Sequence, residues 1–361
     1  MSVSVARRQP WIRSGLADGL WILSPPLFAT AFVAAFQGFP VFADGMPDAA
    51  WVLLIVCVDV AHVWSTLYRT YLDPAERAAR PLLYMLVPVL GWCAGVWLLS
   101  VGWMAFWRAL AYLAVFHFVR QQYGFMRIYA RQESGLPPVC RRLDAAAVYA
   151  ATLHPLIHWH AHLPRKFEWF VAGDFVPLPA AAARIAGWAA LLVYLAYAGK
   201  EAWLWRATRT FNLPRNLVLA GTAAAWYLGI VVYDGDLAFT ATNVLAHGIP
   251  YLALVWFHGR RRRDASAPAA AGVGRFFSTA AIPAYLGLVL LLAFLEEGFW
   301  DAFFWREHPV IFGWFSSLPR VDDPMVRTLL VPLLAVPQVT HYLLDGFIWK
   351  LRGTGSGWKE G

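Results

Sequence analysis

Apolar stretches of about 20 residues alternate with short polar breaks along most of the chain. Because a membrane-spanning helix needs about 20 mostly apolar residues, each such stretch is a candidate span. Ten stretches qualify: 19–37, 49–71, 82–102, 104–127, 143–162, 182–204, 214–233, 238–258, 277–297 and 327–349. The pattern predicts an all-α, polytopic transmembrane bundle of about ten helices, with nine as the lower count.

The composition agrees with a membrane solvent. Of the 361 residues, 60% are hydrophobic and 14% are charged, whereas soluble domains carry roughly 45–50% and about 25%. The chain is basic, with a pI near 9.5, but its cations occur in short clusters between apolar stretches. That arrangement is typical of cytoplasmic loops, so we expect no nucleic-acid partner.

The distribution of Lys and Arg predicts the orientation. With the N-terminus inside, alternate polar segments on the inner side hold 22 of the 30 cationic residues, and the outer loops hold four. Cytoplasmic loops of membrane proteins carry this excess. We therefore expect both termini in the cytoplasm and a multi-pass protein of the inner (cytoplasmic) membrane.

No polar segment is long enough for a separate catalytic domain, so residues 1–361 are expected to form a single integral membrane domain. Its extramembrane parts would be a cytoplasmic N-terminal segment (1–18), a cytoplasmic basic loop (259–276), an extracytoplasmic aromatic loop (298–326) and a cytoplasmic tail (350–361). Glu296 and Glu297, at the outer end of the ninth span, are expected to be solvated.

Histidines recur at one depth of the expected bundle. Five spans each carry one about ten residues from their cytoplasmic end, or roughly 15 Å at 1.5 Å per residue. A sixth follows one turn further along the fifth span. The candidate metal ligands are His62, His117, His154, His158, His247 and His341. Neutral imidazole is the commonest protein metal ligand, although a lone membrane histidine is more often a helix–helix contact.

Polar residues share helix faces with these histidines. Asp59 precedes His62 by three residues, and Asp345 and Tyr251 each follow a histidine by four. They are candidates for catalytic and ligand-orienting roles.

Arg120 and Gln121 follow His117 by three and four residues. They are candidates for binding the polar end of a substrate. Arg120 could equally pair with a buried carboxylate.

A histidine-rich, thiolate-poor site suits Fe, Cu or Zn rather than Mg or Ca. The three cysteines, Cys57, Cys93 and Cys140, form no C-x-x-C pair. The sequence contains no phosphate-binding loop, no dinucleotide fingerprint, no H-E-x-x-H and no G-x-S-x-G. Iron, as a mono- or dinuclear centre, is the expected metal.

The His154-Pro155-Leu156-Ile157-His158 string resembles a histidine box of membrane di-iron desaturases and hydroxylases, but no H-x-x-H-H box accompanies it. Single histidines on several helices resemble more closely the architecture of the bacterial Brp/Blh β-carotene dioxygenases. That resemblance implies that lone intramembrane histidines hold iron. It also implies that at least one of the five depth-matched histidines is not a ligand, since that family uses four.

The sequence thus favours an enzyme, a metal-dependent oxidoreductase that uses O2 on a lipophilic small molecule or lipid, with an electron donor as a further partner. Two alternatives stay open. The buried His and Asp residues could form a proton relay in a transporter, or histidine pairs could bind haem for electron transfer.

Overall fold

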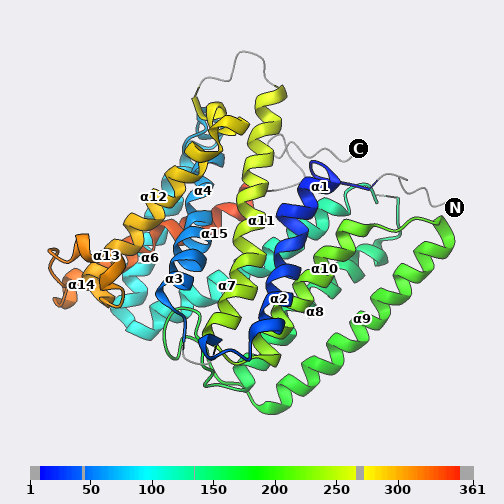
Figure 1. Ribbon diagram of the computed structural model, residues 1–361, viewed down its shortest axis with the longest axis horizontal. Helices are drawn as coiled ribbons and strands as arrows, with labels where there is room; N and C mark the ends of the chain where they lie inside the picture. Colours follow the sequence, from blue (N-terminus) through cyan, green and yellow to red (C-terminus); the bar gives the residue numbers. More distant parts are fainter. Residues whose placement is uncertain (1–8, 43–44, 134, 266–271, 350–361) are drawn as a thin grey trace. The chain divides into compact units, whose positions relative to one another are not determined.

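The computed structural model describes residues 9–42, 45–133, 135–265 and 272–349, and every regular element in these ranges is helical (Figure 1). Seven helices in the described ranges are long and apolar enough to cross a membrane. They are Gly15–Phe36, Asp48–Arg69, Pro81–Val101, Ala180–Thr208, Leu213–Val232, Asp236–Ala265 and Thr279–Trp305. The chain is therefore an α-helical, multi-pass membrane bundle, as the apolar pattern predicts.

The other three expected spans are also helical but are not among these seven. Two of them are the long helices α7 (Trp103–Tyr129) and α8 (Pro138–Ala161). The third is divided at Ala335 into α14 (Pro324–Leu334) and α15 (Val336–Ile348). Proline is the physical cause of that break, since Pro337 has no N–H to donate to the carbonyl one turn earlier.

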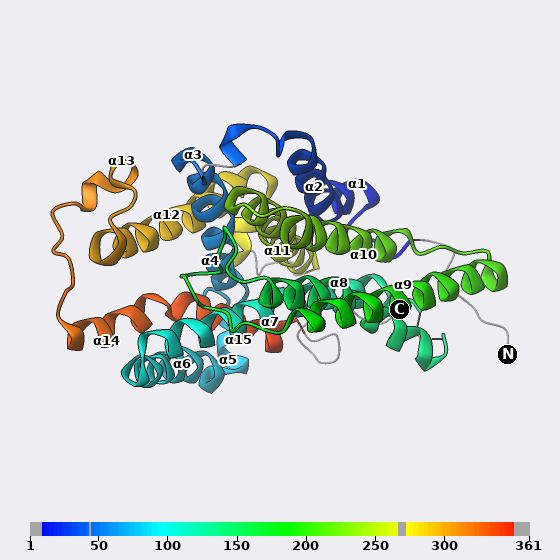
Figure 2. The same ribbon diagram turned by 90° about the horizontal axis from the view of Figure 1, so that it is seen from below.

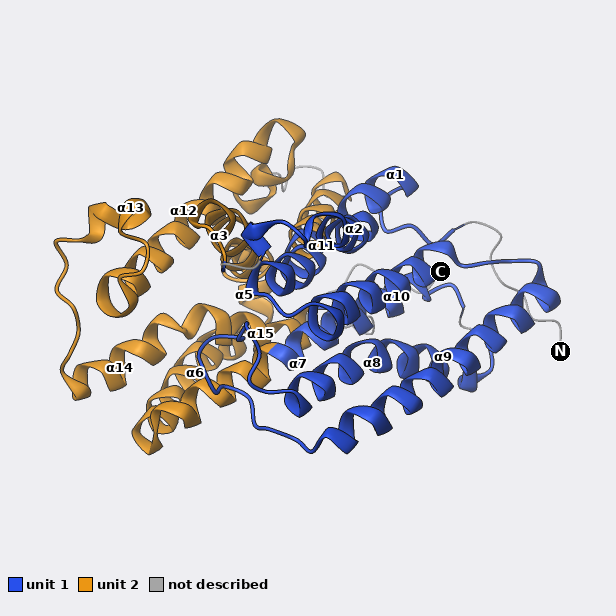
Figure 3. Ribbon diagram, turned by 60° about the horizontal axis from the view of Figure 1, so that its bottom comes forward, with its two compact units in different colours: residues 1–45, 115–250, 349–361 blue, residues 46–114, 251–348 orange. Residues whose placement is uncertain are grey.

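The chain divides into two compact units (Figure 3). Unit 1 comprises residues 1–45, 115–250 and 349–361, and unit 2 comprises residues 46–114 and 251–348. Helices α7 and α11 (Asp236–Ala265) each contribute residues to both units.

Unit 1 is built around two neighbouring helices, α8 and α9 (Ala180–Thr208), which run side by side (Figure 2). Helix α10 (Leu213–Trp226) packs against both α8 and α2 (Ser24–Phe36). Short segments complete the unit, including α1 (Gly15–Asp18) and π-helical turns over Gly19–Leu23 and Tyr227–Val232.

One end of unit 1 holds a buried ion network. The guanidinium of Arg215, only 1% exposed, pairs with Glu133 at 2.5 Å and with Glu201, and it lies 3.7 Å from Asp144. Lys200 pairs with Asp144 as well as with Glu201. Removing one member of such a buried network would leave charges unpaired, so the network fixes how the ends of α8, α9 and α10 meet.

Unit 2 packs around α4 (Ala61–Arg69), which continues a π-helical segment over Val52–Val60 that follows α3 (Asp48–Trp51). Helices α12 (Ile282–Trp300) and α15 contact α4, and α6 (Pro81–Val101) packs against α14 and α15. Shorter helices fill the connections: α5 (Pro74–Ala79), the 3₁₀ turns Gly272–Phe277 and Thr279–Ala281, the π-helical turn Asp301–Trp305, and α13 (Pro309–Phe312).

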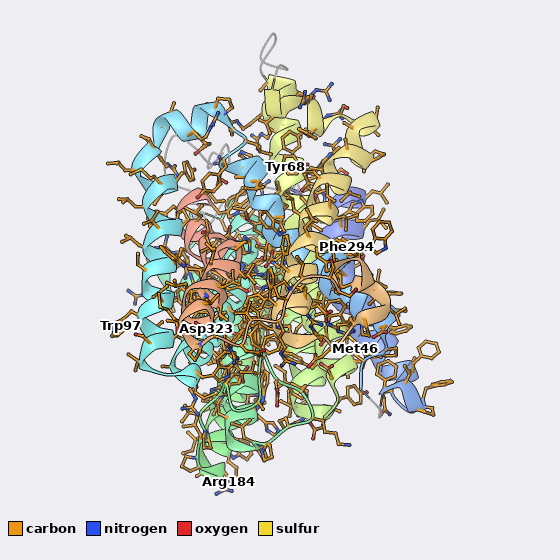
Figure 4. The ribbon with its side chains drawn as sticks, turned by 90° about the vertical axis from the view of Figure 1, so that its left-hand side faces the viewer. Met46, Tyr68, Trp97, Arg184, Phe294 and Asp323 are labelled. Carbon is orange, nitrogen blue, oxygen red and sulfur yellow. The ribbon has the colours of Figure 1, made fainter. Side chains whose placement is uncertain are left out.

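Large apolar side chains cover the outer faces of α6 and α9. Trp97 on α6 is 65% exposed and projects outward (Figure 4), and Trp188 on α9 is 69% exposed. Neighbouring leucines on both helices are exposed to a similar degree. A soluble protein rarely exposes apolar surface this extensive. Such a surface is favourable when it faces the hydrocarbon of a membrane.

The polar segments at the helix ends differ in part from the expected loops. The basic run Arg260–Arg263, expected to open a loop at 259–276, continues α11 as far as Ala265. Arginine favours helix formation, and cations complement the negative C-terminal end of a helix. Residues 1–8 of the expected N-terminal segment, 266–271 of the basic loop and the tail 350–361 lie outside the described residues.

Candidate metal centre

In unit 1, α7 and α11 bring His117 and His247 together. Their Nε2 atoms are 3.2 Å apart, and both side chains are buried. The ring of Phe118 stacks on the His247 imidazole with centroids 3.6 Å apart and planes inclined by 7°. The aromatic face therefore restricts the rotation of His247 and keeps its Nε2 directed at His117.

A proline distorts α11 immediately after His247. Pro250 has no backbone N–H, so the carbonyl of Ala246, four residues earlier, loses its helical partner. The side-chain amide of Gln122 donates to that carbonyl at 3.3 Å, and the amide of Gln121 donates to the His247 carbonyl at 2.9 Å. Two adjacent glutamines of α7 thus satisfy the backbone that carries His247.

In unit 2, α4 and α15 bring His62 and His341 together. Their ring centroids are 4.9 Å apart in an edge-to-face arrangement, and each residue is 1% exposed. The π-helical segment Val52–Val60 ends two residues before His62. Such insertions rotate the following side chains relative to a regular α-helix and are frequent at functional sites.

A directional hydrogen-bond chain fixes the orientation of His341. The Tyr251 hydroxyl donates to Asp345 Oδ1 at 2.6 Å, and Thr66 Oγ1 lies 3.0 Å from the Tyr251 oxygen and 2.6 Å from His341 Nδ1. The Tyr251 hydroxyl proton is donated to the carboxylate, so the Tyr251 oxygen accepts a hydrogen bond from the Thr66 hydroxyl. The Thr66 oxygen in turn accepts a hydrogen bond from Nδ1–H of His341. This tautomer leaves the lone pair on Nε2, the form that a metal ligand requires.

His62 has a similar neighbour. Asp59 Oδ1 lies 3.7 Å from His62 Nδ1, one helical turn away on the same face. A carboxylate near the second nitrogen of a ligating imidazole is the usual way to hold its ring and raise its basicity. Asp59 and Asp345 therefore both lie on the Nδ1 side of a histidine.

His62, His117, His247 and His341, all four buried, form a group that could hold a metal ion. Two imidazole nitrogens bound to one metal at about 2.0–2.1 Å lie roughly 3.0–3.4 Å apart when adjacent and about 4.2 Å apart when opposite. The 3.2 Å between His117 and His247 fits an adjacent pair. This pair therefore already has the spacing that two ligands of one ion need.

The donor set restricts which metals suit the group. Four neutral imidazoles favour first-row transition metals and zinc, whereas calcium and magnesium prefer oxygen ligands. The four residues come from four different helices, α4, α7, α11 and α15. A bound ion would therefore link segments that are far apart in the sequence.

The other two proposed ligands are not members of this group. His154 is half-buried and approaches α9, where a Cβ added at Gly187 would lie 3.3 Å from its Nε2. His158 stacks on His162 with centroids 3.9 Å apart.

The two proposed substrate-binding residues have different surroundings. Arg120 is exposed, donates to the hydroxyl of Tyr149 at 2.7 Å and lies over the ring of Tyr123. The Gln121 amide binds the His247 backbone, as described above. Its Oε1 is buried and has no hydrogen-bond partner among the described residues.

The expectation that Glu296 is solvated is wrong. Glu296 on α12 is 5% exposed and accepts hydrogen bonds from Trp64 Nε1 at 2.7 Å and from the Gln338 amide. Trp64 follows His62 by two residues, and Gln338 precedes His341 by three. The carboxylate therefore connects α4 and α15, the two helices of unit 2 that carry His62 and His341, through hydrogen bonds.

Sequence reasoning missed Glu296, Thr66 and Phe118 as residues that position the histidines. Glu296 follows an apolar stretch directly, a place where a carboxylate is normally assigned to water. Thr66 and Phe118 are ordinary residues of membrane helices. Thr66 does lie four residues after His62, but that spacing alone does not show that it binds His341 instead.

Comparisons of the chain with protein-family models, with curated proteins and with solved structures returned no match.

Proposed function

We propose that this protein is an intramembrane metal-dependent oxidoreductase that acts with O2 on a lipophilic substrate, with iron as its metal. The observation that supports it is the buried group of His62, His117, His247 and His341. Two of these histidines lie within helices that are apolar enough to span a membrane, Asp48–Arg69 and Asp236–Ala265. Ionisable side chains at such depth are costly and normally mark a functional site.

The donor set supports a redox metal. Iron held by these imidazoles would supply redox chemistry toward O2, and the net electrons would come from the lipophilic substrate or from the external electron donor. The protein's own contribution is orientation. Thr66 fixes the tautomer of His341, Phe118 restrains His247, and the surrounding side chains exclude bulk water.

The membrane setting supports the substrate class. A site among apolar helices is reached most readily by molecules dissolved in the bilayer, such as acyl chains or polyenes. As part of this proposal the chain crosses the inner membrane ten times, through the seven apolar helices, α7, α8 and the α14–α15 pair. Both termini would then be cytoplasmic, in agreement with the positive-inside distribution of Lys and Arg.

A proton relay is the second candidate, favoured by the chain His341–Thr66–Tyr251–Asp345. Linked hydroxyls and a carboxylate can pass protons along a membrane protein. Haem is less compatible with the geometry. Two axial histidines lie on opposite faces of a porphyrin, whereas the Nε2 atoms of His117 and His247 are only 3.2 Å apart.

The test is the metal content of detergent-purified protein, measured by mass spectrometry together with an optical spectrum. We expect near-stoichiometric iron and no Soret band in the wild type. Each of His62→Asn, His117→Asn, His247→Asn and His341→Asn should lower metal retention by about tenfold or more. His154→Asn and His158→Asn are matched controls, because both remove a histidine of the same bundle from outside the four-residue group.

Two results would contradict the proposal. One is a folded wild type that stays metal-free after anaerobic iron loading, and the proton relay would then be tested by proton flux in liposomes. The other is an equal metal loss in the control variants. Iron-loaded protein would next be assayed for O2 consumption with lipid and polyene substrates.

A further inference from the structure

A second concave site lies in unit 2, distinct from the four-histidine group. It is a cavity of about 400 Å³ lined by residues of α4, α5, α11 and the 3₁₀ turn Gly272–Phe277. Its size is that of a small-ligand pocket, for which the usual range is roughly 300–1,000 Å³. Tyr68, labelled in Figure 4, lies in the last turn of α4 and forms part of its wall.

The polar lining of this cavity is mainly cationic. Arg69, Arg262 and Arg263 line it together with one carboxylate, Asp73. Arg69 is 2% exposed and pairs at 2.6 Å with Glu76. Arg262 pairs with Asp73, which also caps the N-terminus of α5.

Counting these pairs leaves one positive charge. Arg263 donates to the carbonyl of Phe277 at 3.2 Å, and no carboxylate pairs with it among the described residues. Among the described residues, the three guanidinium groups thus pair with two carboxylates, Asp73 in the lining and Glu76 outside it, so one singly charged anion would complete the balance. Arginine suits that task, because its planar fork binds phosphate or carboxylate oxygens in pairs.

The rest of the wall is apolar and held in place. Tyr68, Val255 and Phe277 contribute rings and methyl groups to the lining. The ring of Phe277 packs against α11 at Gly259. A Cβ at position 259 would lie 2.3 Å from that ring, so only glycine fits at this position. The cavity therefore combines a charged end with apolar walls, which matches an amphiphile better than a fully hydrated ion.

The position of the cavity agrees with that chemistry. Arg69 ends the apolar span Asp48–Arg69, and Arg262 and Arg263 lie in the last turn of the span Asp236–Ala265. The ends of membrane-spanning helices generally lie at the depth of lipid head groups. By the positive-inside distribution, this would be the cytoplasmic surface.

We propose that this cavity binds one singly charged anionic head group, a phosphodiester or carboxylate carried by an apolar chain, with Arg262 and Arg263 as its ligands. The site is independent of the metal centre. The arginines also complement the C-terminal end of α11 and the positive-inside rule, so they would attract anionic lipid without any pocket. Residues outside the cavity on the same turn distinguish these two roles.

The experiment is a lipid titration of the full-length protein in detergent, with bound molecules counted by native mass spectrometry. The probes are phosphatidylglycerol, which carries one negative charge, phosphatidylcholine, which carries none overall, and inorganic phosphate. We expect the wild type to bind phosphatidylglycerol at least about tenfold more tightly than phosphatidylcholine. The Arg262→Gln/Arg263→Gln variant should lose this preference.

The matched control is Arg260→Gln/Arg261→Gln, which removes the same charge from the same helix but from residues that do not line the cavity. It should keep the preference. Val255→Trp fills the cavity without changing the charge and should weaken phosphatidylglycerol binding. Thermal unfolding and metal content of each variant show whether it is folded and separate this result from that of the metal centre.

Each outcome decides the proposal. Phosphatidylglycerol binding that depends on Arg262, Arg263 and the open cavity supports it with a lipid as the ligand. Equally tight binding of inorganic phosphate, with the same dependence, supports the anion site with a free anion as its source. Equal binding of the two lipids without phosphate binding, or equal losses in both double variants, would overturn it.

Discussion

Replacing Gln122 by leucine tests how the backbone around His247 is stabilised. Leucine is similar in size to glutamine but cannot donate to the Ala246 carbonyl, which Pro250 has deprived of its helical partner. Leaving a buried carbonyl unpaired costs about 1–3 kcal/mol. Thr222, which also contacts Gln122, keeps its second hydrogen bond to Val218 and adds little to the loss.

The size of the effect can be measured as a shift in thermal unfolding in detergent. At about 2–4 °C per kcal/mol for chains of a few hundred residues, Gln122→Leu should lower the midpoint by roughly 2–12 °C. The decisive comparison is the same substitution in a Pro250→Ala background. An alanine N–H can bind the Ala246 carbonyl, so Gln122→Leu should then cost much less.

The double-mutant cycle isolates the coupling between Gln122 and Pro250. An equal loss of stability with proline and with alanine at position 250 would refute the reasoning. The effect of Gln122 would then come from packing rather than from the freed carbonyl. Metal retention measured on the same four proteins reports whether the geometry of His247 follows the backbone.

Three other predictions follow from the contacts around the site and in the ion pairs. Thr66→Val should weaken metal retention by about 10–100-fold, because Nδ1 of His341 loses its acceptor, and Thr66→Ser should restore it in the same mass-spectrometric assay. Burial alone would raise the pKa of Glu76, but its ion pair with Arg69 lowers that pKa below the ordinary 4.5. The stabilisation is therefore complete above pH 4.5 and is lost as the pH falls through the folded-state pKa, so the difference in unfolding midpoint between wild type and Glu76→Gln should be large at pH 7 and shrink in acid. An unchanged difference at low pH would contradict that assignment. Arg215→Gln should destabilise unit 1 by about 3–5 kcal/mol, seen as a large fall in the unfolding midpoint, since its carboxylate partners stay buried with fewer cations.

The helical architecture was largely predictable from the sequence. Membrane-spanning segments must satisfy their backbone internally and present apolar surface, so length and hydropathy along the chain locate them. All ten expected segments are helical in the structure. The break at Ala335 between α14 and α15 was not anticipated, although Pro332 and Pro337 lie on either side of it.

The metal centre was predictable only as a set of candidates. Counting residues along each helix gives the depth of a histidine, and five shared nearly one level, with a sixth one turn further along. Depth does not give the direction in which a side chain points, which depends on the rotation and packing of its helix. His154 approaches Gly187 on α9, while His117, at a similar expected depth, faces His247.

The sequence by itself determined that this is a polytopic helical membrane protein with intramembrane histidines, because hydrophobicity and residue spacing are properties of single segments. The tertiary structure alone paired His117 with His247 and His62 with His341, the four residues that could hold a metal ion. It also decided that the buried carboxylate of Glu296 links α4 to α15 through hydrogen bonds. The same holds for the two glutamines of α7, which donate hydrogen bonds to backbone carbonyls of α11 near Pro250. These features join residues up to 279 positions apart, and such pairs are set by how helices pack, not by the pattern along any one of them.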